Sequence, residues 1–308
     1  MGKAINTNNE ARAKEYHLLV RVFFFRVLRV SSLCFLLIFL LGSVVRTQET
    51  DQLSVTIREG NTEQKRDALF QIRNLRSEAA SRAALPGLRD SDPIVRATAA
   101  ASVVFLPKLE ALAALTPLLN DRDAFVRKEA AYALGRVESP DAAAPLIGLL
   151  QREKDLEVRA AAVVGLGSTG SPAAVEPLLA TLRRRPDEET EFLRRSAARS
   201  LGRIAQVINT GSSYTVTPEN FLPDKYKKTN GERVAAGQPA FEAAVPVLSG
   251  VLQDRREADD TRREAAYALG AIGNPLAINV LRSHQNSPDP YLAEISKEAL
   301  LKIDAGKK

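Results

Sequence analysis

Apolar residues recur at every fourth position in a stretch that is repeated along the chain. In the stretch of residues 123–151, DAFVRKEAAYALGRVESPDAAAPLIGLLQ, the stripe consists of Val126, Ala130 and Leu134. Apolar residues four apart lie on one face of a helix. The heart of the stretch, EAAYALG, occurs twice, at residues 129–135 and 264–270. Such self-similarity identifies the folding unit of a repeat protein.

The polar residues of the same stretch predict where its helices begin and end. Asp123 is a good N-cap, and Gly135 can adopt the left-handed conformation that ends a helix. Ser139 and Pro140 supply a second N-cap with proline at the first helical position. The unit is therefore predicted to be a helical hairpin, too small to bury both of its faces alone.

The hairpin pattern fits the chain seven times. The residues in register with Val126 are Gln64, Val95, Val126, Val158, Leu193, Thr261 and Leu292. Four residues later the chain has only small residues: Ala68, Ala99, Ala130, Ala162, Ala197, Ala265 and Ser296. Eight residues later it has only aliphatic residues: Ile72, Val103, Leu134, Leu166, Leu201, Leu269 and Leu300. Small residues allow helices to approach closely, so the two columns predict stacked helical repeats.

Three segments carry a family resemblance. VRKEAAYALGRVESPDAAAPLIGLL, VRAAAVVGLGSTGSPAAVEPLLATL and TRREAAYALGAIGNPLAINVL resemble HEAT repeats of the short, phycobilin-lyase type. The resemblance extends from about Asp51 to the C-terminus. It implies an all-α fold, a right-handed α-solenoid of about seven stacked hairpins, similar to HEAT and armadillo proteins. It says almost nothing about function, because function depends on sites that differ within a fold.

The pattern divides the chain into a leader, a linker and a repeat domain. Residues 1–45 are predicted to be a basic leader, residues 46–61 a linker and residues 62–308 the repeat domain. The step of 68 residues between Leu193 and Thr261 indicates an insertion. It falls at about residues 206–239, where the helical period stops and the composition favours a loop.

The leader contains an apolar run of sixteen residues, Val30–Val45. This length lies between the apolar core of a signal peptide and a transmembrane helix. The arginines before it favour a cytoplasmic N-terminus and an exported repeat domain, periplasmic or otherwise extracytoplasmic in a bacterium. A cleaved signal peptide and a retained inner-membrane anchor formed by residues 30–45 remain equally open. Cys34 lies in the run, so the exported part would have no cysteine.

The positive charge does not indicate a nucleic-acid partner. The net charge is +6, but residues 1–45 hold six Lys/Arg and two acidic residues. The remainder has 37 basic and 35 acidic residues, which makes a mixed surface. We expect no nucleic acid as partner, and contact with a membrane only through the N-terminal segment.

The sequence offers little for a catalytic site. It has two histidines, His17 and His284, and no cluster of His, Cys, Asp or Glu with metal-ligand spacing. Some helical-repeat relatives are di-iron hydroxylases with repeated His-Glu pairs, and this chain has no such pair. We therefore predict that the chain is not an enzyme and assign no catalytic, cofactor-binding or metal-ligating residue, and no cofactor.

Two charged columns have a structural interpretation. Acidic residues stand three positions before the register, as N-caps should: Asp92, Asp123, Asp155 and Asp289. Basic residues follow the register by one position: Lys65, Arg96, Arg127, Arg159, Arg194 and Arg262. The family resemblance implies a ladder of charged hydrogen bonds between adjacent repeats. Two further basic groups, Arg183–Arg185 and Arg255–Arg256, lie where second helices end and suit the helix dipole there.

Two other features stand out against the repeat. Pro145, Pro177 and Pro246 occupy matching places in second helices and are interpreted as repeated kinks. The insertion carries aromatic and basic residues that are candidates for partner binding: Tyr214, Phe221, Lys225, Tyr226, Lys227 and Lys228. The alternative is that the insertion is a surface loop without a binding role.

The function predicted from the sequence is a non-catalytic scaffold for protein–protein interaction. In this interpretation the chain is a monomer, and its second helices line a concave surface for a protein partner. The alternative is a lyase-type or other enzyme, or an accessory subunit, that acts on a chromophore or a modified protein.

Overall fold

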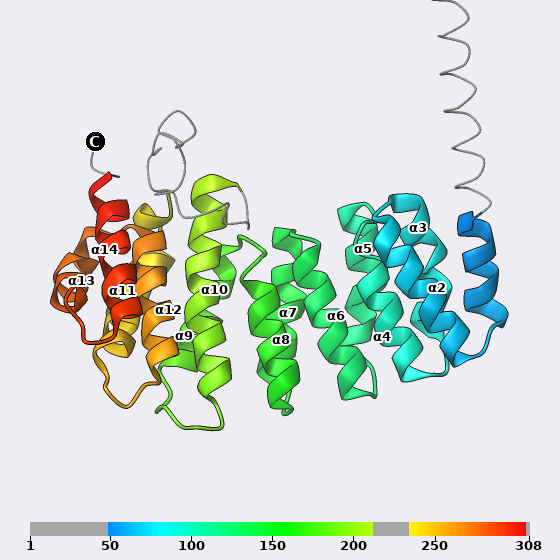
Figure 1. Ribbon diagram of the computed structural model, residues 1–308, viewed down its shortest axis with the longest axis horizontal. Helices are drawn as coiled ribbons and strands as arrows, with labels where there is room; N and C mark the ends of the chain where they lie inside the picture. Colours follow the sequence, from blue (N-terminus) through cyan, green and yellow to red (C-terminus); the bar gives the residue numbers. More distant parts are fainter. Residues whose placement is uncertain (1–48, 212–233, 306–308) are drawn as a thin grey trace, which may run out of the picture. The chain divides into compact units, whose positions relative to one another are not determined.

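The computed structural model describes residues 49–211 and 234–305, and these residues form helices and no strands. The chain divides into two compact units, Met1–Leu53 and Ser54–Lys308, and the repeats lie in the second unit (Figure 1). No helix among the described residues is long and apolar enough to cross a membrane. The predicted leader lies outside the described residues.

Each register residue lies in the first helix of a hairpin. The first helices are α2 (Thr62–Leu75), α4 (Pro93–Ser102), α6 (Ala124–Arg136), α8 (Leu156–Leu166), α10 (Glu191–Thr210), α12 (Asp259–Ile272) and α14 (Pro290–Ala305). Consecutive first helices pack on one another and form one layer.

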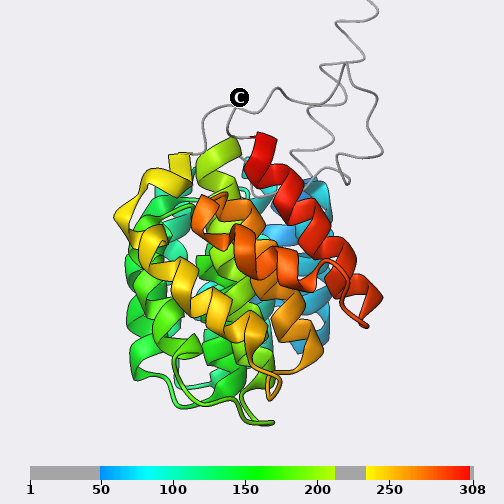
Figure 2. The ribbon, with the colours of Figure 1, turned by 90° about the vertical axis from the view of Figure 1, so that its left-hand side faces the viewer.

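The second helices are shorter, and 3-10 turns precede or follow them. They are α3 (Glu78–Ala83) with η1 (Leu85–Arg89), α5 (Lys108–Leu115) with η2 (Thr116–Asn120), η3 (Pro140–Ala142) with α7 (Ala143–Arg152), η4 (Pro172–Ala174) with α9 (Val175–Leu182), η7 (Val234–Gly237) with α11 (Pro239–Gln253), and η8 (Pro275–Ala277) with α13 (Ile278–His284). They form the other layer, so that α11 and α14 lie on opposite sides in Figure 2. This arrangement confirms the predicted all-α stack of hairpins.

The two columns of the sequence form the core between the layers. Ala130 and Ala265, from the small column, have no exposed surface, and neither has Leu134 from the aliphatic column. Leu300, in the last repeat, is half-buried. The periodicity of the sequence therefore marks the residues that hold neighbouring hairpins together.

Gly135 does not end a helix, contrary to the sequence interpretation. It lies inside α6, and a Cβ atom at this position would lie 2.6 Å from the Cα of Gly165 in α8. After α6 the left-handed conformation belongs to Glu138, with a φ of 51°. The glycine is needed because the backbones of α6 and α8 touch here, not because the chain turns.

Two of the three predicted proline kinks are absent. Pro145 and Pro177 lie in the first turns of α7 and α9. A proline in a first turn removes no helical hydrogen bond, because the N–H groups there have no partner within the helix. Among the three, Pro246 lies inside its helix, α11.

The boundaries of the linker and of the insertion also differ from the prediction. Residues 49–59 are helical, and Ile57 is buried. The helix α10 continues to Thr210, five residues beyond the predicted end at Ala205. Asn209 stabilises this extension, because its Nδ2 donates to the carbonyl of Ala271 at 2.9 Å. Residues 206–210 and 234–237 of the predicted insertion are thus helical, and residues 212–233 lie outside the described residues.

The capping aspartates and the ladder cations have different partners. Asp92 accepts a hydrogen bond from the N–H of Ile94, and the side chains of Asp123, Asp155 and Asp289 cap the other helices in the same way. The arginines pair with other acids. Arg96 donates from Nε and Nη2 to Asp121, each at 2.8 Å.

Four of the six ladder cations pair with an acid that follows the second helix of their own repeat. Lys65 pairs with Asp90 at 2.7 Å, Arg127 pairs with Glu153 at 2.7 Å, and Arg194 pairs with Glu257. Nη1 of Arg96 also donates to the carbonyl of Asp90, and Nη1 of Arg127 to that of Asp121. Each of these two arginines therefore connects the turn before its repeat to the turn after it.

The ladder changes at two places. Arg262 pairs weakly with Asp259 at 3.4 Å, while its neighbour Arg263 takes Asp289 at 2.8 Å. The other place is Arg159, whose buried Nε has no hydrogen-bond partner among the described residues.

The contact between α6 and α8 yields a prediction with an internal control. Gly135→Ala is expected to lower the free energy of unfolding by about 1–3 kcal/mol, because the new methyl group meets backbone that cannot move aside. Gly250→Ala, in α11 where a Cβ atom meets nothing within 4 Å, is expected to raise it by up to about 1 kcal/mol. Urea unfolding followed by circular dichroism measures both. Equal effects of the two substitutions would contradict the close contact.

Candidate functional site

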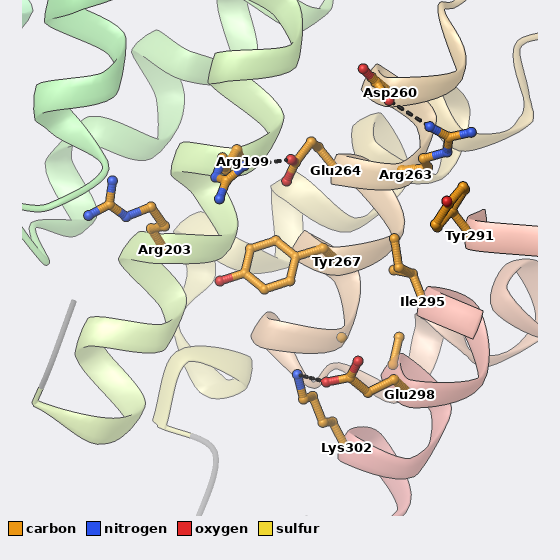
Figure 3. Close-up of a pocket in the computed structure, with 12 residues that line it drawn as sticks. Arg199, Arg203, Asp260, Arg263, Glu264, Tyr267, Tyr291, Ile295, Glu298 and Lys302 are labelled. Atoms are coloured by element: carbon orange, nitrogen blue, oxygen red, sulfur yellow. Dashed lines mark hydrogen bonds and ion pairs between the residues drawn. The ribbon is translucent and has the colours of Figure 1, made fainter. Parts of the chain in front are cut away.

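A pocket of about 610 Å³ lies where α10, α12 and α14 meet. Its lining residues are Arg199, Arg203, Asp260, Arg263, Glu264, Tyr267, Gly270, Tyr291, Ile295, Glu298, Ala299 and Lys302. Figure 3 shows that the polar side chains come from all three helices. These are first helices, whereas the sequence analysis placed the binding surface on second helices.

The repeat itself brings the central residues together. Glu264 and Tyr267 lie three residues apart in α12, so they share one face of the helix. Tyr267 lies six residues after the register residue of α12. The same position is Arg199 in α10 and Glu298 in α14, and both line the pocket beside Tyr267. The three helices are parallel members of one layer, so side chains at one register position line up across it.

Glu264 is the most perturbed carboxyl group of the pocket. Its Oε1 accepts a hydrogen bond from Nη1 of Arg199 at 3.0 Å, and the side chain is 19% exposed. Burial raises the pKa of Glu264, and the charges of Arg199 and Arg195 offset only part of the rise. A carboxyl group with a raised pKa in a cleft is typical of functional sites.

Tyr267 forms the floor between Glu264 and α14. Its hydroxyl donates to Oε1 of Gln206 at 2.8 Å, and burial raises the pKa of the phenol. The Nζ of Lys302 lies 6.0 Å from the ring centre and 2.7 Å from Oε1 of Glu298. The ring therefore presents an aromatic surface with a paired cation at its edge.

Arg263 and Tyr291 form the rim of the pocket. Arg263 lies between two carboxylates, with Nη1 2.7 Å from Asp260 and Nε 2.8 Å from Asp289. Its guanidinium carbon lies 5.0 Å from the centre of the Tyr291 ring, which is 68% exposed. The hydrogen bond to Asp289 raises the pKa of Arg263, so its guanidinium stays charged between the two carboxylates.

The sequence analysis missed this site, and the site residues it named in the insertion lie outside the described residues. These are Tyr214, Phe221, Lys225, Tyr226, Lys227 and Lys228. A signal for the pocket was present in the column six residues after the register. This column is Ala101, Tyr132 and Val164 in the middle repeats, but Arg199, Tyr267 and Glu298 in the last three.

Comparison with known proteins identifies the family. HEAT repeats match residues 81–165, 149–210 and 233–301, which is more than half of the chain. The chain belongs to the HEAT-repeat family. This agrees with the resemblance of its repeats and with the two layers of helices.

Curated relatives share only part of the chain. Deoxyhypusine hydroxylase of Gallus gallus is 41% identical over 68 residues, 22% of this chain and 23% of that protein. The Rattus norvegicus enzyme is 40% identical over 68 residues, 22% of each chain. The chain thus spans less than a quarter of the length of the curated relatives it matches.

Solved structures support the fold. An engineered protein superposes with a TM-score of 0.51 at 19% identity, covering 83% of this chain and 68% of that one. The complex of CpcE and CpcF of phycocyanin lyase from Nostoc sp. gives 0.47 at 20% identity, covering 84% and 91%. Human deoxyhypusine hydroxylase with glycerol gives 0.35 at 20% identity, covering 86% and 99%. At these identities the likeness concerns the fold alone.

The prediction that the chain is not an enzyme is wrong by these comparisons. The curated relatives are hydroxylases, which are enzymes. The sequence analysis relied on the lack of His-Glu pairs. That argument tested one metal centre and not catalysis in general, because a carboxyl group of raised pKa such as Glu264 needs no such pair.

The described residues do not fit the di-iron centre that hydroxylase relatives suggest. In residues 49–211 and 234–305, no three or more His, Cys, Asp or Glu side chains come close enough to hold a metal ion. His284 is the histidine in this part of the chain, and its Nδ1 lies 2.9 Å from the carbonyl of Val280 at the end of α13.

The charges around Glu264 make its pKa testable. Arg199→Met is expected to raise the pKa of Glu264 further, because the charge that lowers it most is removed while burial remains. Carbon-13 NMR titration of the labelled carboxyl group measures the shift. Arg203→Met is the matched control, because Arg203 lies on the same helix but its guanidinium donates to the hydroxyl of Ser168. It should leave the pKa of Glu264 unchanged. A lower pKa in Arg199→Met would contradict the pairing.

Proposed function

We propose that the chain acts in the enzymatic modification of a protein and that the pocket of α10, α12 and α14 holds a side chain of that protein. The observation that carries the proposal is the half-enclosed carboxyl group of Glu264, whose pKa is raised by burial, next to the ring of Tyr267. The pocket volume of about 610 Å³ is in the range of ligand sites.

The chemistry of the pocket fits a long side chain that ends in an amine. Carboxylates and aromatic faces both attract an ammonium group. Arg199, which is 64% exposed, is a weakly held partner of Glu264, because exposed ion pairs contribute little. An incoming ammonium can replace it without leaving the carboxylate unpaired. A carboxyl group with a raised pKa can then exchange a proton with the bound amine.

The surface beyond the pocket favours a protein over a free small molecule. Exposed aromatic rings with cations beside them continue along the first helices. Lys128 lies 5.3 Å from the ring centre of Phe125, and Arg195 lies 5.3 Å from that of Phe192. Aromatic and arginine side chains on a surface are typical of protein interfaces. The curated relatives are named for deoxyhypusine, and a modified amino acid within a protein is the kind of substrate that this surface suits.

We propose further that the insertion at about 206–239 contributes to partner binding through Tyr214, Tyr226 and Lys225–Lys228. The position of the last residues before the insertion supports this proposal. Gln206 accepts from the hydroxyl of Tyr267, so the end of α10 adjoins the pocket.

Photo-crosslinking from the pocket tests the proposed function. A benzoylphenylalanine in place of Ile295, inside the pocket, is expected to trap a protein whose crosslinked peptide carries a modified side chain, identified by mass spectrometry. The same group in place of Leu276, which is 74% exposed in η8, should not trap it.

The repeated heptapeptide supplies a matched control for the pocket. Glu264→Gln with Tyr267→Phe is expected to reduce crosslinking about tenfold, equivalent to about 1.4 kcal/mol. Glu129→Gln with Tyr132→Phe makes the same changes in the same sequence outside the pocket and should leave the yield unchanged. Equal yields from both pairs would count against the pocket.

We also propose that residues 1–45 direct the repeat domain out of the cytoplasm. The basic residues before the apolar run of residues 30–45 support this orientation. A reporter enzyme that is active only outside the cytoplasm, fused after Lys308, is expected to be active with the leader and silent without it. Activity that is independent of the leader would reject export, and N-terminal sequencing distinguishes a cleaved signal peptide from an anchor.

A further inference from the structure

The first two rungs of the arginine ladder follow a rule that relates each rung to the next. The carbonyl of Asp121 accepts a hydrogen bond from Nη1 of Arg127, which belongs to the following repeat. The side chain of the same Asp121 pairs with Arg96 of its own repeat. Asp90 does the same for Arg96 and Lys65. The residue whose carbonyl receives the next arginine therefore carries the acid that neutralises the preceding cation.

The rule does not extend to the later rungs. Arg262 donates to the carbonyl of Leu252 and not to that of Glu257, the acid that pairs with Arg194.

The turn between α9 and α10 departs from the rule in another way. Nη1 of Arg194 donates to the carbonyl of Arg184 at 2.6 Å and to that of Thr181 at 3.2 Å. A cation, Arg184, thus provides the shortest of these contacts, whereas the acids Asp90 and Asp121 accept from the arginines of the earlier rungs. The preceding ladder cation is Arg159. A cation, Arg184, thus lies where the rule predicts an acid that would pair with Arg159. Two arginines therefore face each other at this turn.

The environment of Arg159 reflects the missing acid. Its Nε is buried and has no hydrogen-bond partner among the described residues. Burial lowers the pKa of Arg159, and the charge of Arg184 lowers it further. Asp187, an acid of the same turn, accepts from the N–H of Thr190 at 2.8 Å and forms no ion pair with Arg159 or Arg184 among the described residues. Within the described chain, no carboxylate compensates this pair of charges.

We propose that Arg159 and Arg184 form a binding site for a carboxylate that completes the ladder from outside. The other rungs define the chemistry, since the guanidinium of Arg96 holds Asp121 with two parallel hydrogen bonds of 2.8 Å. Such a fork suits a planar carboxylate. Arg159 is half-buried and Arg184 is exposed, so the carboxylate can enter from solvent. It can belong to a small carboxylic acid or to an acidic side chain of a bound polypeptide.

Thermal unfolding of the full chain at constant ionic strength tests the site. Acetate and a ten-residue glutamate peptide are the carboxylate probes, with chloride as the reference anion. Both are expected to raise the melting temperature of the wild type by about 2–4 °C at saturation, because they bind the folded state only. A larger shift with the peptide at equal carboxylate concentration identifies a polypeptide as the source, and equal shifts identify a small acid.

Arg184→Glu restores the rule and is the decisive variant. It is expected to melt about 2–4 °C higher than the wild type in chloride and to lose the response to acetate, because the new acid fills the rung. Arg185→Glu makes the same charge change one residue away and should keep the response. Arg184→Gln provides a second test if Arg184→Glu fails to fold, and it should weaken the response at least tenfold in concentration.

Three outcomes would overturn the proposal. The first is no shift with either carboxylate, and the second is a shift with inorganic phosphate but none with carboxylates. The third is a response that survives in both variants at Arg184, which would place the bound carboxylate elsewhere.

Discussion

Buried guanidinium groups at the turns between hairpins are the constraint on which this stack depends. Arg194 is 2% exposed and Arg96 is 7% exposed, so each needs an acid to offset the cost of leaving water. The same groups also bind the carbonyls of neighbouring turns, and this fixes the distance from one hairpin to the next. Removing one partner of such a pair typically costs about 3–5 kcal/mol, because the other charge stays buried.

The fixed spacing explains why the contacts between the first helices are so demanding. The backbones of α6 and α8 approach until a single Cβ atom at Gly135 would meet the Cα of Gly165. The same holds where a Cβ atom at Gly270 would lie 2.6 Å from the Cβ of Ala299. Small residues in the columns are thus a consequence of the turn-to-turn distance, and the repeat can vary elsewhere without losing its stacking.

The sequence predicts the fold well because burial recurs with the repeat. It predicts local roles less well where one residue type serves two purposes. A glycine at the end of an apolar run can terminate a helix or admit a neighbouring backbone, and only the packing of α8 decides for Gly135. Three acids of the ladder follow their cations by 25 or 26 residues, but they lie beyond the second helices and outside the aligned columns of the first helices. Glu257 follows Arg194 by 63 residues because the insertion separates them.

The two copies of EAAYALG show why the candidate site could not be recognised from a motif. Glu129 and Tyr132 have the same seven-residue context as Glu264 and Tyr267. The difference lies in the neighbouring helices, which place small apolar residues beside Tyr132 and charged ones beside Tyr267. The site of a repeat protein is formed by residues at one register position in several neighbouring helices. It therefore becomes visible only when the same position is compared across the repeats.

The same reasoning bears on the likeness to deoxyhypusine hydroxylases. A match over 68 residues covers about two hairpins, which are the stacking units of a repeat protein. Relatives can therefore share the stack and differ in the columns that face solvent, where the chemistry resides. The described columns of this chain offer a perturbed carboxyl group, a tyrosine and paired cations in place of a cluster of metal donors. An enzymatic role for this chain thus has to be derived from the residues around Glu264, because the inherited fold carries no reaction of its own.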